Sequence, residues 1–256
     1  MNSSNYIAFR TIVVKEIRRY LRIWLQTVLP PMVTTALYFI IFGQLIGRQI
    51  GTIAGYTYMD YIVPGLILMA VITNSYANVV SSFYGAKFSH YVEELLIAPI
   101  PNTLILLGFV TGGVARGLTV GLAVTAVASF FTTLHLHNLL VVAAVVILTS
   151  VLFSLGGFIN AVYAKSFDDI SIVPTFVLTP LTYLGGIFYS IDMLPGVWRD
   201  ISLFNPILYM INAFRFGLLG VSDIGVATAF GVILLFIALL FGYALFLLQR
   251  GVGLKQ

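Results

Sequence analysis

The chain contains six apolar runs, each long enough to cross a lipid bilayer as a helix. A helix needs about 20 residues to span the hydrocarbon core, and it satisfies its own backbone hydrogen bonds there. These runs predict an all-α polytopic membrane protein with six transmembrane helices. The predicted spans are residues 23–46, 61–81, 103–131, 139–163, 170–190 and 226–248.

Composition limits how much of the chain lies in water. Only 9% of the 256 residues are charged and 60% are hydrophobic, whereas roughly a quarter of a soluble domain is charged. We therefore expect a single transmembrane domain over residues 1–256. The chain has no cysteine, so disulfide bonds and thiolate metal sites are excluded.

Basic residues indicate how the spans are oriented. Arg22 precedes the first span, Lys87 and Lys165 lie in two loops, and Arg250 follows the last span. With six spans, all of them fall on one side of the membrane. The positive-inside rule then places both termini in the cytoplasm. The net charge of +4 is therefore interpreted as an orientation signal, and no nucleic-acid partner is expected.

Residues 205–220 are apolar but too broken to form a seventh span, because Asn205, Pro206 and Arg215 interrupt them. A seventh span would also place the basic C-terminus on the outer side, against the same rule. We predict an outer broken helical hairpin over residues 191–224. It would pack against protein, since irregular backbone at membrane depth is not left facing lipid.

The segment 83–101, between the second and third spans, is too polar for hydrocarbon and is predicted to be cytoplasmic. It carries Glu93 and Glu94 and the pattern of a short amphipathic helix that ends at Pro99. Such a helix either docks onto another protein or lies flat on lipid. The apolar positions at helical spacing are Phe88, Tyr91, Val92, Leu95 and Leu96.

Residues 1–22 have the pattern of a helix with one broad apolar face and many basic residues. The charges set the topology. The helix is also predicted to lie along the inner membrane surface, where lipid phosphates or an acidic partner would attract it. Its polar positions include Lys15, Glu16, Arg18 and Arg19.

The third span contains glycines at intervals of four residues, at Gly113, Gly117 and Gly121. Such ridges let helices approach closely, so we predict a packing surface. Arg116 lies among them. An arginine within a span is a functional candidate, but a structural or snorkelling role is favoured here over contact with substrate.

Polar residues also recur at helical spacing in two other spans. Two interpretations stay open, a lining for an amphiphilic substrate and hydrogen bonding between helices. The residues are Asn74 and Asn78 in the second span, and Thr175, Thr179 and Thr182 in the fifth. Pro174 and Pro180 would kink the fifth span.

Motifs for catalysis or cofactor binding are absent. Residues 164–166 (Ala-Lys-Ser) lack the preceding glycines of a phosphate-binding loop, so no nucleotide is expected to bind by that route. His135 and His137 do not share a helix face, which disfavours a metal site. Asp168 and Asp169 are expected to cap a helix N-terminus. No cofactor is predicted for this chain.

Several motifs occur together in a specific order. They are Lys15–Glu16, Pro30–Pro31, residues 63–66 (Val-Pro-Gly-Leu), residues 93–99 (Glu-Glu-Leu-Leu-Ile-Ala-Pro), residues 185–188 (Gly-Gly-Ile-Phe), and Asn205–Pro206 followed by Arg215. In this order the chain resembles the permease subunits of type-2 ATP-binding-cassette (ABC) export transporters, which include bacterial drug, lipid and polysaccharide exporters. The chain departs from their pattern at His90-Tyr91, where the family usually has Gly-Thr.

The resemblance implies a mechanism. Two copies would form a homodimer, and each copy would bind a separate ATPase subunit that holds ATP and Mg²⁺. Residues 83–101 would form the cytoplasmic coupling helix, with Glu93 at the acidic position. Substrate would leave toward the outer hairpin. The alternatives are an ATPase-independent secondary transporter or channel and, less favoured, a membrane-embedded enzyme that modifies lipids.

Overall fold

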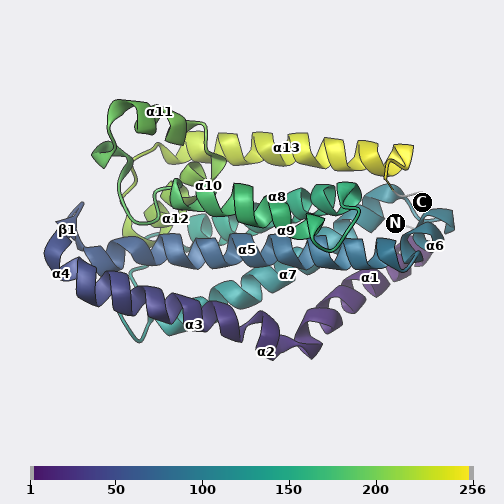
Figure 1. Cartoon of the computed structure of the whole chain (residues 1–256), viewed down its shortest axis with the longest axis horizontal. Coiled ribbons are helices and arrows are strands. Elements are labelled where there is room, and N and C mark those ends of the chain that lie inside the picture. Colours follow the sequence, from purple (N-terminus) through teal and green to yellow (C-terminus); the bar gives the residue numbers. More distant parts are fainter. Residues whose placement is uncertain (1–2, 254–256) are drawn as a thin grey trace.

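The computed structural model describes residues 3–253, so the ends of the predicted 1–256 domain and of the 1–22 helix lie outside the described residues. Almost all of the described chain is helical, and the long helices run side by side along one axis (Figure 1). The helices are α1 (Ser3–Arg22), α2 (Trp24–Thr27), α3 (Leu29–Tyr38), the π-helix η1 (Phe39–Ile46), α4 (Gly47–Ile50), α5 (Tyr58–Phe88), α6 (Tyr91–Ile97), α7 (Asn102–Ala128), α8 (Leu139–Tyr163), α9 (Asp169–Val173), the π-helix η2 (Pro174–Leu178), α10 (Thr179–Tyr183), the 3₁₀ helix η3 (Ile191–Met193), α11 (Gly196–Leu203), α12 (Pro206–Leu219) and α13 (Val226–Arg250). A short antiparallel pair, β1 (Thr52–Ile53) and β2 (Tyr56–Thr57), precedes α5.

Five helical stretches in residues 3–253 are long and apolar enough to cross a membrane. This confirms the all-α polytopic membrane fold. The stretches are Trp24–Gly43, Tyr58–Phe88, Asn102–Ala128, Leu139–Tyr163 and Val226–Arg250.

The predicted fifth span, residues 170–190, is not one long helix. Helical structure begins at Asp169, passes through a π-helical turn that starts at Pro174, and ends at Tyr183. Gly186 then adopts a positive φ of 76° in the turn that follows, a conformation that glycine adopts without strain. The prolines and this turn shorten the helix, so the count of six spans remains a prediction.

Helix α5 forms the centre of the bundle and packs against α7 and α8. Its 31 residues are mostly buried. At about 1.5 Å per residue the helix is longer than the hydrocarbon core is thick, so it projects beyond the predicted span of 61–81. Residues 83–88 continue α5, and the separate helix α6 therefore covers only part of the predicted 83–101 segment.

The glycines of α7 lie where neighbouring helices come closest. A Cβ added at Gly113 would meet Val79 of α5 at 2.7 Å, and one at Gly121 would meet Val71 at 2.9 Å. Gly117 faces serines of both α5 and α8. Because glycine has no side chain, α5 and α8 can pack closely onto α7 at these positions.

Helix α1 packs against α7 at two further glycines. A Cβ at Gly108 would lie 2.6 Å from Ile12, and one at Gly112 would lie 2.5 Å from Glu16. Both α1 residues are buried. The N-terminal helix is therefore packed against the bundle along one face.

Gly157 of α8 provides a test of this packing. A Cβ there would lie 2.6 Å from the backbone carbonyl oxygen of Tyr76 in α5, and a backbone atom cannot move aside by a rotamer change. We expect Gly157→Ala to destabilise the protein by about 1–3 kcal/mol. The thermal unfolding midpoint of the purified protein in detergent measures this.

Gly231→Ala is the matched control, because a Cβ at Gly231 in α13 meets no atom within 4 Å. Alanine favours helix over glycine, so this variant should be as stable as the parent or about 1 kcal/mol more stable. Equal midpoints for the two variants would contradict the close contact between α5 and α8.

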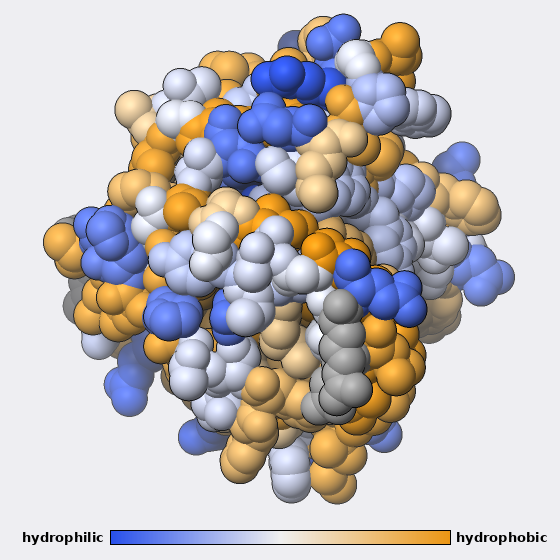
Figure 2. Space-filling view, turned by 90° about the vertical axis from the view of Figure 1, so that its left-hand side faces the viewer, coloured by the Kyte–Doolittle hydropathy of each residue, from blue (hydrophilic) through white to orange (hydrophobic). Residues whose placement is uncertain are grey.

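Helices α6, α1 and the end of α13 lie at one end of the bundle, and β1, α4 and α11 lie at the other (Figure 1). Figure 2 looks onto the α11 end, where hydrophilic residues lie among patches of hydrophobic ones. The predicted outer hairpin, residues 191–224, consists here of η3, α11 and α12. The two ends therefore carry the two polar segments that the sequence analysis placed on opposite sides.

Candidate coupling surface and transport pocket

Helix α6 turns away from α5 at His90, which adopts the left-handed conformation with φ of 58°. Histidine adopts this conformation more readily than β-branched residues do. Its ring nitrogen Nδ1 lies 3.2 Å from Oε1 of Glu93. The contact joins the turn to the first turn of α6.

The apolar stripe of α6 faces the protein. Val92 and Leu95 are buried, and Tyr91 and Leu96 are half-buried against the same core. Of the apolar positions predicted for the stripe, only Phe88 is exposed, so Val92 and Leu95 are not free to bind a partner in this structure. The stripe is taken up by the protein's own core because α6 folds back beneath α5.

A different face of this region is free. The side chains of Phe88, at the end of α5, and Ile97, at the end of α6, are 64% and 86% exposed, and Glu94 is exposed three residues before Ile97. We call Phe88, Glu94 and Ile97 the coupling surface. Two apolar side chains with one acid suit contact with another protein better than contact with water alone.

Helix α1 contacts α6 directly. The ammonium group of Lys15 lies 3.9 Å from the centre of the Tyr91 ring, a favourable cation–π distance. Arg18 is exposed on α1 and lies with Arg10 and Lys15 around a shallow surface hollow. The basic residues of α1 thus border α6.

A buried polar network attaches α1 to α5. The Glu16 side chain is fully buried and accepts a 2.6 Å hydrogen bond from the hydroxyl of Ser82. Arg19 Nε lies 3.5 Å from the same carboxylate, and Arg19 Nη2 donates to Asn78 Oδ1 and to the Asn78 carbonyl at 2.8 Å. Glu16 and Arg19 therefore do not face lipid headgroups, as a purely interfacial helix would require.

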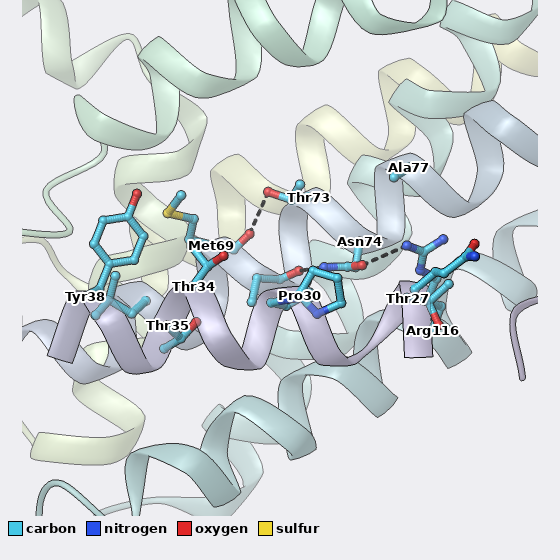
Figure 3. Close-up of a pocket in the computed structure, with 14 residues that line it drawn as sticks. Thr27, Pro30, Thr34, Thr35, Tyr38, Met69, Thr73, Asn74, Ala77 and Arg116 are labelled. Atoms are coloured by element: carbon cyan, nitrogen blue, oxygen red, sulfur yellow. Dashed lines mark hydrogen bonds between the residues drawn. The ribbon is translucent and has the colours of Figure 1, made fainter. Parts of the chain in front are cut away.

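A pocket of about 340 Å³ lies between the first span and α5. Figure 3 shows Tyr38 near one end and Arg116 with Asn74 near the other. Arg116 Nη2 donates to Asn74 Oδ1 at 2.9 Å. Asn74 thus lines a pocket. Asn78, predicted to share this role, is instead hydrogen-bonded to Arg19.

A second pocket, of about 220 Å³, lies between α5 and the segment η2–α10, and α5 residues such as Met69 line both pockets. Thr175, Thr179 and Thr182 line it. The hydroxyl of Thr179 donates to the Pro174 carbonyl at 2.9 Å, and that of Thr182 donates to the Leu178 carbonyl at 2.7 Å. These bonds satisfy carbonyls near the kink, and the residues line a pocket as well, so both interpretations of the stripe stay open.

Aromatic residues join the walls of the two pockets at one end. The hydroxyls of Tyr38 in α3 and Tyr183 in α10 are 3.0 Å apart. Phe188 stacks on Phe42 with ring centres 4.7 Å apart. Sequence patterns did not indicate these contacts, because the partners lie in different spans.

The region of α12 holds a fully buried arginine. Arg215 Nη2 donates to the carbonyl of Gly186 at 2.5 Å, and its guanidinium lies 4.0 Å from the centre of the Tyr61 ring. Asn205 caps α12 by accepting from Ile207 N at 3.0 Å, and Pro206 occupies the first turn. These three predicted residues fix the hairpin to the bundle.

The aspartates and histidines that were considered for metal binding or catalysis make local structural contacts. Asp168 makes no capping hydrogen bond, contrary to expectation. Asp169 Oδ2 instead accepts hydrogen bonds from the backbone amides of Lys165 and Ser166. The bond from Lys165 is the main cause of a lowered pKa for the Asp169 carboxyl. His137 packs edge-on against Phe216.

Together, the long apolar helices, the short helix exposed between two of them and the pockets between spans define a polytopic membrane transport subunit. The chain belongs to the ABC-2 type transporter family, whose family model matches residues 7–219. It is 56% identical, over 98% of both chains, to the inner membrane transport permease YadH of Escherichia coli (strain K12). It is 23% identical, over 88% of both chains, to nodulation protein J of Rhizobium leguminosarum bv. viciae. These matches confirm the resemblance to ABC permease subunits.

Proposed function

We propose that this protein is the membrane-spanning subunit of an ATP-driven exporter of the bacterial inner membrane. A separate ATPase subunit would bind ATP and Mg²⁺, and this chain would carry an amphiphilic substrate such as a drug, lipid or glycolipid out of the cytoplasm or inner leaflet. The coupling surface carries the proposal, because it exposes two large apolar side chains and one acid. The transport names of the relatives support a non-enzymatic role.

The contacts around α6 suggest how ATPase movement would reach the spans. A force on α6 would pass to α1 through Lys15 and Tyr91. From α1 it would pass to α5 through Glu16, Arg19 and their partners. Since α5 lines both pockets, its movement would change both of them.

A second copy of the chain is the proposed partner within the membrane. Only 17% of the first span's most apolar window is buried, against 83% for α5. The first span therefore presents an apolar face that membrane lipids or a second copy would cover. We propose a homodimer with this face toward the partner and with both termini in the cytoplasm, at the α6 end.

Co-purification with an ATPase tests the function. The tagged permease, expressed with a candidate ATPase subunit from the same organism, should retain that subunit in detergent and show ATP hydrolysis. Reconstituted vesicles should move substrate only with ATP. Transport by the permease alone would favour the secondary transporter or channel, and chemical change of a lipid would favour the enzyme.

A further inference from the structure

Arg116 is the one charged side chain among the described residues that line the pocket between the first span and α5. The other lining residues are apolar or neutral, including Pro30, Met69 and Thr73 (Figure 3). No carboxylate lies within 4 Å of Arg116 in residues 3–253. A cation in a largely apolar pocket thus has no protein counter-ion.

The hydrogen bonds of Arg116 leave donors available. Nη2 binds the Asn74 side chain, while Nε is buried and has no partner in the described chain. The buried carboxylate of Glu16 accepts from Ser82 through Oε1 and forms an ion pair with Arg19 at 3.5 Å through Oε2, so its charge is paired with a different arginine. Leaving a partly buried guanidinium without a counter-ion is unfavourable, so an anionic ligand would improve the site.

The pocket is elongated with its charge near one end. Its α5 wall extends from Leu66 to Ala77, a rise of about 16 Å at 1.5 Å per residue. Arg116 and Asn74 lie near one end and Tyr38 near the other (Figure 3). This shape fits a single acyl chain with a small acidic headgroup.

We propose that the pocket binds an anionic amphiphile, with its carboxylate or phosphate on Arg116 and its chain directed along α5 toward Tyr38. The proposal rests on the proposed export function and names the substrate class of that site. It replaces the snorkelling role of Arg116 with direct contact to the headgroup. Guanidinium pairs with either oxyanion through charge-assisted hydrogen bonds.

The test uses the full chain, without ATPase, in phosphatidylcholine nanodiscs. The fluorescent probes are dansylaminoundecanoic acid, the corresponding dansylaminoundecyl phosphate, and the neutral methyl ester of the acid. Empty nanodiscs correct for partitioning into lipid. We expect at least one of the two acids to bind about tenfold more tightly than the ester, as one charge-assisted hydrogen bond provides. The tighter acid identifies the headgroup.

Arg116→Gln should bring the acid-to-ester affinity ratio to about one, while Arg116→Lys keeps part of the preference. Arg250→Gln, which removes a charge at the end of α13, should leave the ratio unchanged. Met69→Trp should fill the pocket and weaken the binding of all three probes. An equal affinity for acid and ester in the parent protein, or an unchanged ratio in Arg116→Gln, would overturn the proposal.

If Arg116→Gln does not fold, the comparison of acid and ester binding by the parent protein still tests the proposal. Because no ATPase is present, a negative result here leaves the export function standing. Conversely, the ATPase could fail to associate while the protein still prefers the acidic probes. That result would contradict the export function, but the pocket would remain assigned as a site for anionic amphiphiles.

Discussion

Replacing Ile97 by aspartate is expected to reduce ATP hydrolysis by the assembled transporter at least about tenfold, with the permease itself still folded. Ile97 is 86% exposed, so the change disturbs no core contact of this chain. In the complex, however, it would bury an unpaired carboxylate against an apolar site on the ATPase. Such burial costs several kcal/mol, and each 1.4 kcal/mol is a factor of ten in association.

The measurement is substrate-stimulated ATPase activity in vesicles, together with the amount of ATPase retained on the tagged permease. Val197→Asp is the matched control, because Val197 is 71% exposed on the short helix α11 at the opposite end of the bundle. It should hydrolyse ATP like the parent. Normal activity in Ile97→Asp would show that α6 is not where the ATPase binds.

The sequence alone favours Leu95→Asp as the test of docking, but the structure shows that this variant is less informative than Ile97→Asp. Its place in the amphipathic stripe predicts a docking residue, yet the side chain is only 8% exposed and packs on the core of this chain. An aspartate there would destabilise the permease directly. Helical periodicity identified α6 as amphipathic, but it could not decide whether the apolar face binds the protein itself or a partner.

The long spans were predictable because length and apolar composition determine them nearly alone. The contacts between spans were not predictable from the same patterns. Glu16 lies in a basic N-terminal segment, where a solvated carboxylate is the ordinary expectation, and its burial depends on Ser82 in another helix. Asn74 and Asn78 share a stripe, but only the first reaches a pocket, since Arg19 binds the second.

The outer hairpin depends on one residue that the sequence did identify. Arg215 was singled out as an interruption of an apolar segment, and it proves to be fully buried. It holds the carbonyl of Gly186 and the face of Tyr61, so it connects α12 with the turn after α10 and with α5. This contact thus joins a 14-residue helix, too short to span a membrane, to the bundle.

Arg215→Ala is expected to destabilise the protein by about 3–5 kcal/mol. The change leaves a cavity and an unpaired buried carbonyl, and it removes the cation–π contact. Arg215→Met fills most of the volume and should lose less, since it also relieves the cost of burying a charge. Thermal unfolding in detergent measures the difference.

Arg199→Ala is the control, because Arg199 pairs with Asp192 at the exposed surface and should contribute less than about 1 kcal/mol. If Arg215→Ala and Arg199→Ala unfold at the same temperature, Arg215 does not fix α12 to the bundle.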